Sequence, residues 1–307
     1  RFDSGTFTHV PALEEVNLGD NFMPRLPEEL LRPLPSLKSF IVRGGLLTSL
    51  PAGIFSTCHG LTSVVLSHNA LRSLPDGVFE GLNRLERLAL SQNRLPTISS
   101  AWFGQGAVYH KLVRFMAIEN RVTSIPSNLL SLMPNVNNIG LQKNSLTRLP
   151  DDFVFGTATN LHVLDLSGNA ISSLQPNAFH RFTALRHLSL SGNKLSRLSL
   201  PTLPTLLTLR LVDNRLTALP DLRAFDSLYE LYLTNHHVHT LDLALAVRDE
   251  DDLGVADDVV ELGEVAKHRL LRFGHRGIGG VLLAVARLAR VRHVDVLGRE
   301  VHESGRR

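Results

Sequence analysis

A single pattern of leucines recurs along most of this chain and restricts it to folds built from repeated units. The segment from Leu161 to Leu174 follows the pattern LxxLxLxxNxLxxL, in which x is any residue and L is leucine or a similar apolar residue. The spacing between successive copies falls within the roughly 20–29 residues of repeats that combine one strand with a return segment. We therefore expect a solenoid, in which each unit packs only against its neighbours. The units begin at Leu13, Leu37, Leu61, Leu85, Leu112, Val136, Leu161, Leu185, Leu206 and Leu228.

The centre of each unit predicts a short parallel strand. In Leu164-Asp165-Leu166, two leucines flank one polar residue. Side chains alternate between the two faces of a strand, so both leucines should point into the solenoid and the residue between them should point out. Stacked units then form a parallel sheet with one exposed face. The composition suits thin layers of this kind, because 43% of the residues are hydrophobic and only 6% are aromatic.

An asparagine recurs at the point where the chain turns away from each strand. A carboxamide both donates and accepts hydrogen bonds, so stacked asparagines can satisfy backbone groups that the turn leaves unpaired. We expect these residues to form a structural ladder. Two units depart from the pattern, with Gly45 and His236 in the asparagine position. The ladder residues are Asn21, Asn69, Asn93, Asn120, Asn144, Asn169, Asn193 and Asn214.

The second half of several units carries Leu-Pro followed by a phenylalanine. Proline can neither donate to a sheet nor continue a helix, so the returning side should be extended and irregular, with the phenylalanines stacked beneath it. The Leu85 unit is longer than its neighbours, and its additional residues should bulge on the convex or rim side. The Leu-Pro pairs and their phenylalanines are Leu50-Pro51 with Phe55, Leu74-Pro75 with Phe79, and Leu149-Pro150 with Phe155.

The whole pattern, LxxLxLxxNxLxxLPxxxFxxL, resembles the typical leucine-rich repeats of extracellular receptors and matrix proteins, from about residue 2 to residue 241. The resemblance implies an α/β-type repeat solenoid: a right-handed horseshoe with a parallel concave sheet and a mostly irregular convex side. It also implies a binding module at the cell surface or in a secreted protein. Family members usually carry cysteine-rich caps, whereas this sequence has one cysteine.

The two ends of the array are atypical. Residues 1–12 read as the tail of an earlier unit, so we expect the chain to begin within a longer array of which residues 1–241 are the visible part. From residue 242 to 307 the repeat stops, and almost every residue is Val, Ala, Asp, Glu, Gly, Leu, Arg or His. These residues can all be encoded by codons that begin with G or C, so one interpretation is a wrongly predicted reading frame in GC-rich DNA. The alternative is a helical cap, because apolar residues recur near helical spacing from Val259 to Leu270.

The register also predicts which side chains face outward on the concave sheet. The residues between the inward positions should form one stripe, which is apolar in its early half and flanked by charged residues. A contiguous exposed apolar patch with a charged rim is a usual mark of a protein-binding site. An ordinary aliphatic sheet face is the alternative. The candidate binding residues are Ile41, Arg43, Val65, Arg87, Ala89, Arg114, Met116, Ile118, Glu119 and Tyr232.

Other clusters are better explained by structure than by chemistry. The histidines His236, His237 and His239 lie on a turn, where their side chains should diverge instead of converging on a metal ion. The glycines at 274–280 lack the spacing of a phosphate-binding loop. The acidic pairs and runs at 151–152 and 249–252 lack the alternating oxygen ligands of a calcium loop. Cys58 occupies the same position as Leu82 in the next unit, which predicts a small buried hydrophobe.

These observations favour a non-catalytic module without metal or cofactor. The net charge is only +3, so we expect no attraction to nucleic acid. The apolar run at 277–291 is short and is interrupted by Arg287 and Arg290, so this segment should not insert into a membrane. We predict a protein ligand, with a glycan as a further possibility. The alternatives are a cytosolic scaffold or regulatory subunit, and a sensor array attached to a catalytic domain outside this sequence.

Overall fold

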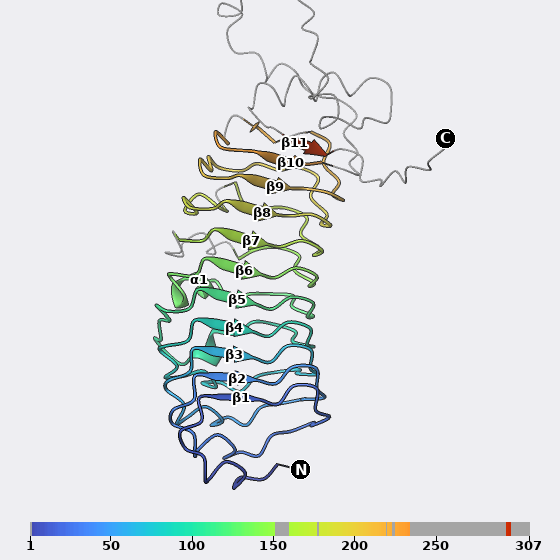
Figure 1. Ribbon diagram of the computed structural model, residues 1–307. Coiled ribbons are helices and arrows are strands. Elements are labelled where there is room, and N and C mark those ends of the chain that lie inside the picture. The colour runs from blue at the N-terminus through green and yellow to red at the C-terminus, as the bar shows by residue number, and fades with distance from the viewer. Residues whose placement is uncertain are drawn as a thin grey trace, which may run out of the picture.

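Short strands stack in the order of the sequence to form one parallel sheet (Figure 1). The computed structural model describes residues 2–150, 160–176, 178–218, 220–222 and 225–233, together with the backbone of residues 293–295. Each strand pairs in register with the next, as Val64 does with Leu88. The strands are β1 (Glu15–Asn17), β2 (Ser39–Ile41), β3 (Ser63–Val65), β4 (Arg87–Ala89), β5 (Arg114–Met116), β6 (Asn138–Gly140), β7 (Val163–Asp165), β8 (His187–Ser189), β9 (Thr208–Arg210), β10 (Glu230–Tyr232) and β11 (His293–Asp295).

The predicted solenoid with a parallel sheet is confirmed. Every predicted unit from Leu13 to Leu228 contributes one three-residue strand, and the central residue of each is buried. Strand β11 pairs with β10 and comes from the segment in which the leucine pattern has stopped. Residues 242–292 and 296–307 lie outside the described residues, so the helical-cap and reading-frame interpretations of this segment stay predictions. The histidine cluster at 236–239 also lies outside them.

The return side of the units contains little regular structure, as the proline positions predict. Within the described ranges, it carries the 3₁₀ helix η1 (Ser100–Phe103) and the one-turn helix α1 (Leu129–Leu132). The Ser99 hydroxyl caps η1 by accepting a hydrogen bond from the Ala101 amide at 3.2 Å. Helix η1 belongs to the longer Leu85 unit, so the additional residues lie on the side opposite the sheet, as expected. No helix among the described residues has both the length and the apolar character needed to cross a bilayer.

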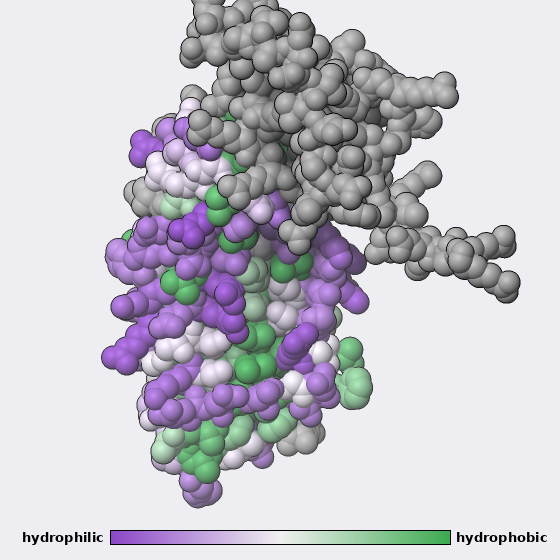
Figure 2. Space-filling model, turned by 45° about the horizontal axis from the view of Figure 1, so that its top comes forward, coloured by the Kyte–Doolittle hydropathy of each residue, from purple (hydrophilic) through white to green (hydrophobic). Residues whose placement is uncertain are grey.

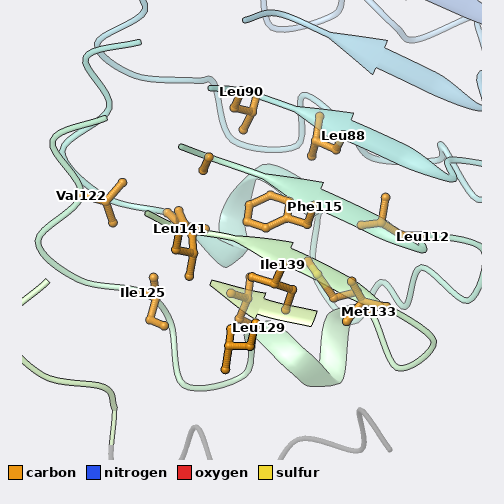
Figure 3. Close-up of a cluster of buried hydrophobic side chains, with 14 of the residues drawn as sticks. Leu88, Leu90, Leu112, Phe115, Val122, Ile125, Leu129, Met133, Ile139 and Leu141 are labelled. Atoms are coloured by element: carbon orange, nitrogen blue, oxygen red, sulfur yellow. The ribbon is translucent and has the colours of Figure 1, made fainter. Parts of the chain in front are cut away.

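The core lies between the sheet and the return segments. Figure 3 shows Phe115 of β5 packed within this layer, with Leu88 of β4 and Ile139 of β6 on the neighbouring strands and Leu129 of α1 opposite. All four side chains are fully buried. Because each inward residue contacts its equivalents in the units above and below, the layer is continuous from one unit to the next.

Aromatic rings form a second buried row beneath the return segments. The Phe55 and Phe79 rings stack with centroids 6.2 Å apart, and Phe103 continues the row at 5.7 Å from Phe79. Tyr109, from the longer unit, packs edge-on against Phe103 at 5.1 Å. Phe155, the third predicted member, lies outside the described residues. Cys58 is fully buried, as predicted, and burial raises the pKa of its thiol.

The asparagines connect successive turns. In seven of the eight predicted ladder positions, the side-chain oxygen accepts a hydrogen bond from a backbone amide of the preceding unit. Asn93 is typical, since it accepts from the Leu71 amide at 3.1 Å and donates to the Leu66 carbonyl at 2.9 Å. The exception is Asn21, whose hydrogen bonds remain within its own unit.

Candidate protein-binding face

The outward side chains of the sheet, which we call the concave face, lie in three columns that follow from the strand register. The first column contains the first residue of each strand, the middle column contains the last, and the third contains the second residue after the strand. The first column is Glu15, Ser39, Ser63, Arg87, Arg114, Asn138, Val163, His187, Thr208 and Glu230. The middle column is Asn17, Ile41, Val65, Ala89, Met116, Gly140, Asp165, Ser189, Arg210 and Tyr232. The third is Gly19, Arg43, Ser67, Ser91, Ile118, Gln142, Ser167, Ser191 and Val212.

The early half of the middle column forms a continuous apolar row. Ile41, Val65, Ala89 and Met116 are paired in register on strands β2 to β5, and each is half-buried. On the face that Figure 2 displays, small hydrophobic areas lie between broader hydrophilic ones. The apolar row is therefore accessible to a partner.

Gly140 extends this apolar row across β6 although it has no side chain. A Cβ atom added to Gly140 would lie 2.7 Å from the Met116 sulfur and 3.3 Å from Cγ1 of Ile118. Both apolar side chains therefore lie over the Gly140 backbone, and a larger residue there would displace them. The pattern of leucines holds no signal for this contact, because the leucines define only which residues point inward.

The late half of the middle column is polar. Asp165, Ser189 and Arg210 line a shallow hollow of about 490 Å³, which also reaches His187 and Glu230 of the first column. One oxygen of Asp165 accepts the Ser167 amide at 2.9 Å. In the first column, Thr208 lies 3.1 Å from Nδ1 of His187 and donates to Glu230 at 3.2 Å.

Tyr232 lies at this polar end and not beside the apolar row. Its ring is covered by the Arg210 guanidinium, whose central carbon is 4.6 Å from the ring centroid. The structure therefore separates Tyr232 from the other candidate binding residues by four strand positions, from Gly140 to Arg210. Whether it contributes to binding stays a prediction.

The arginines border the apolar row on both sides. Arg43, in the third column, lies 3.4 Å from Nε2 of His68. Arg87 and Arg114, in the first column, are exposed and directly paired in the register of β4 and β5. Among the described residues, neither of these two guanidinium groups has a carboxylate within 4.0 Å.

Glu119 belongs to a row of residues whose left-handed backbone conformation the sequence analysis did not predict. The residue before each ladder position has a positive φ, and this residue is not a glycine in six units, Glu119 among them. Glu119 accepts hydrogen bonds from Lys143 at 2.6 Å and from Gln92 at 2.8 Å, and both lower the pKa of its carboxyl group. The sequence does carry a signal for this conformation. None of these positions holds a β-branched residue, because a left-handed backbone excludes such residues.

Two glutamine oxygens near the centre of the concave face are buried without a hydrogen-bond donor among the described residues. They are Oε1 of Gln92 and Oε1 of Gln142. Buried polar atoms are normally satisfied, so these two oxygens are exceptions within the sheet. Within the same ranges, no group of three or more His, Cys, Asp or Glu side chains could hold a metal ion.

Comparison with known proteins finds the same pattern elsewhere. The family model described as "Leucine rich repeat" matches residues 35–95, 59–105 and 120–195. An adenylate cyclase of Podospora anserina is 33% identical over 89 residues, which are 29% of this chain and 4% of that protein. Opticin of Bos taurus is 39% identical over 89 residues, which are 27% of this chain and 26% of opticin. The chain thus spans only a small part of these relatives.

Solved structures share the fold over a longer part of the chain. The Toll–Spatzle complex of Drosophila contains a chain that matches with a TM-score of 0.59 and 25% identity. The match covers 79% of this chain and 35% of that one. It therefore extends over most of the array of stacked strands.

Proposed function

The chain is a leucine-rich-repeat protein, and on that premise we propose that it is a non-catalytic module that binds a protein partner on its concave face. The main support is the apolar row from Ile41 to Met116, which four consecutive strands hold in register on an accessible surface. Monomeric proteins rarely expose contiguous apolar surface unless it binds something. The row has the charged border that is common around such sites, with Arg43 on one side and Arg87 and Arg114 on the other.

The mode of binding follows from the shape of the sheet. Three-residue strands place their outward side chains on one continuous surface, so a partner can contact several units at once. Burying apolar side chains in the centre while leaving the charged ones at the rim is the usual division of an interface. The Toll chain, which shares the fold, was solved in complex with Spatzle.

We further propose that the chain is part of a cell-surface or secreted protein. The Leu-Pro-x-x-x-Phe form of its return segments, as in Leu74 to Phe79, supports this location by resemblance to extracellular repeats. The matches to opticin and Toll support it in the same way.

The second candidate is a sensor array attached to a catalytic domain outside this sequence, and one observation favours it. The matched Podospora anserina protein is an adenylate cyclase, so related repeats occur within an enzyme. Sequencing the complete transcript separates the two candidates. A secretory signal with cysteine-rich caps supports the first, and an adjoining catalytic domain supports the second.

The binding face is tested by placing charge in the apolar row. The double variant Val65→Asp, Met116→Asp should fold normally and lose capture of partner proteins from the cell surface and secretions of the source organism. The matched control is Leu46→Asp, Val108→Asp, because both residues are exposed apolar side chains outside the three columns. Equal urea midpoints establish that both variants fold. Undiminished capture by the concave variant would reject the proposal.

A further inference from the structure

The two arginines of the first column lie side by side without a counter-charge. Arg87 and Arg114 are register partners on β4 and β5, and adjacent strands in a sheet lie about 4.8 Å apart. Both are exposed, and no carboxylate of the described residues comes within 4.0 Å of either group. The acidic residue nearest in sequence, Glu86, forms no ion pair with them. Like charges on directly opposed residues of a sheet destabilise it, so the isolated chain carries an unfavourable pair.

We propose that Arg87 and Arg114 form an anion-binding clamp for an acidic side chain of the partner protein, an inference that rests on the proposed function of the concave face. A guanidinium group presents paired N–H donors that match both oxygens of a carboxylate. Two such groups on adjacent strands hold one carboxylate between them. The anion also removes the repulsion between the arginines.

The neighbouring surface determines the class of ligand. Ala89 and Met116 follow two residues after Arg87 and Arg114 on the same face of the same strands. Strand residues rise by about 3.3 Å each, so the clamp and the apolar row are roughly 6.6 Å apart. An extended segment with an acidic residue and an aliphatic residue at alternate positions has the same spacing. A sulfated glycan supplies the charge but no apolar side chain for Met116, so a protein segment is the occupant that the surface fits.

The charges on the rest of the concave face also favour an acidic ligand. The Glu119 carboxylate, near the apolar row, is held by Lys143 and Gln92. Arg43 adds a third positive charge across the row. The carboxylates of the first and middle columns lie on β1, β7 and β10, at Glu15, Asp165 and Glu230, and not on the strands of the apolar row. The approach to the apolar row is therefore basic, which attracts an acidic segment.

The test uses the full chain and two fluorescein-labelled, terminally blocked peptides, Glu-Thr-Leu-Thr-Glu and Lys-Thr-Leu-Thr-Lys. Fluorescence anisotropy at low ionic strength should show binding of the acidic peptide and at least about tenfold weaker binding of the basic one. The double variant Arg87→Gln, Arg114→Gln should weaken binding of the acidic peptide about tenfold or more. Added sodium chloride should weaken it in the wild-type chain.

The matched control removes the same charge elsewhere. Arg72→Gln, Arg94→Gln replaces two exposed arginines outside the three columns and should bind the acidic peptide as the wild type does. The clamp variant should also have a higher urea midpoint than the control at low salt, because the repulsion is gone. No binding of the acidic peptide to the wild type, equal binding of the two peptides, or equal binding by the clamp and control variants would each overturn the inference.

The same variants separate this inference from the proposed function. If the Val65→Asp, Met116→Asp variant loses partner capture while the clamp variant retains it, the concave face binds a protein but the clamp does not select it. If all these variants retain capture, both proposals are wrong. Loss of capture in both, with acidic-peptide binding lost in the clamp variant, supports both.

Discussion

In seven units, a single carboxamide satisfies backbone groups that belong to two successive turns. Asn169 donates to the Leu141, Leu166 and Ser167 carbonyl oxygens and accepts from the Leu146 amide at 3.0 Å. Its side chain is buried, so no water can replace these bonds. At the beginning of the array, Asn21 is exposed and bonds only within its own unit. Asparagines at the same repeat position therefore contribute differently to the free energy of unfolding along the chain.

This difference predicts a graded response to alanine substitution. Asn169→Ala should lower the free energy of unfolding by about 1–3 kcal/mol, because it leaves buried backbone groups unpaired. Asn21→Ala should cost less, since water reaches its partners. Asn160→Ala is the control, because Asn160 is exposed and, among the described residues, its side chain bonds to the Asn135 side chain alone. Urea unfolding measures all three, and equal midpoints for Asn169→Ala and Asn160→Ala would contradict the ladder.

At the scale of the element, the longer Leu85 unit adds a tyrosine to the aromatic row. The Tyr109 hydroxyl lies 2.6 Å from the Phe79 carbonyl oxygen and 3.1 Å from that of Phe103. It thereby joins two units at the site of the additional residues. Burial, with a smaller contribution from the Glu80 carboxylate, raises the pKa of Tyr109 to about 12.

The raised pKa predicts a loss of stability in alkali. An unfolded tyrosine ionises near pH 10, whereas folded Tyr109 keeps its proton to about pH 12. The native state thus binds the proton more tightly, and its stability should fall between these values by about 1.4 kcal/mol per pH unit. Tyr109→Phe should be less stable near neutral pH but lose less stability over this range. Parallel pH profiles of the urea midpoint for the two proteins would contradict the assignment.

At the scale of the whole molecule, stability depends on contacts between neighbouring units. Each strand pairs only with the strand before and after it, and the inward residues stack in the same way. Solenoids of this kind behave as one-dimensional arrays, in which a local defect weakens its neighbours more than distant units.

A cavity in the middle of the array should therefore have a local effect. Phe115→Ala should cost about 3–5 kcal/mol, because Phe115 is fully buried between β4 and β6. Hydrogen exchange should accelerate most in the units that contain β4, β5 and β6 and least in the units of β1 and β9. Uniform acceleration along the described units would show that the array unfolds as one cooperative body.

The leucine pattern was sufficient to predict the solenoid, the parallel sheet, the irregular return side and the burial of Cys58. These features follow from the alternation of side chains along a strand and from the conformational limits of proline, which act within one unit. The pattern also placed Ile41, Val65 and Met116 in one row, because register between identical units is the same throughout.

Only the tertiary structure decided how outward side chains meet across units. Met116 and Ile118 lie over Gly140, Glu119 joins Lys143, and Arg210 covers Tyr232. These contacts depend on side-chain rotamers and on left-handed turn residues, and both are set by whichever residue the adjoining unit happens to carry. A repeat sequence determines its backbone because every unit needs the same backbone, whereas its surface is determined by the differences between units.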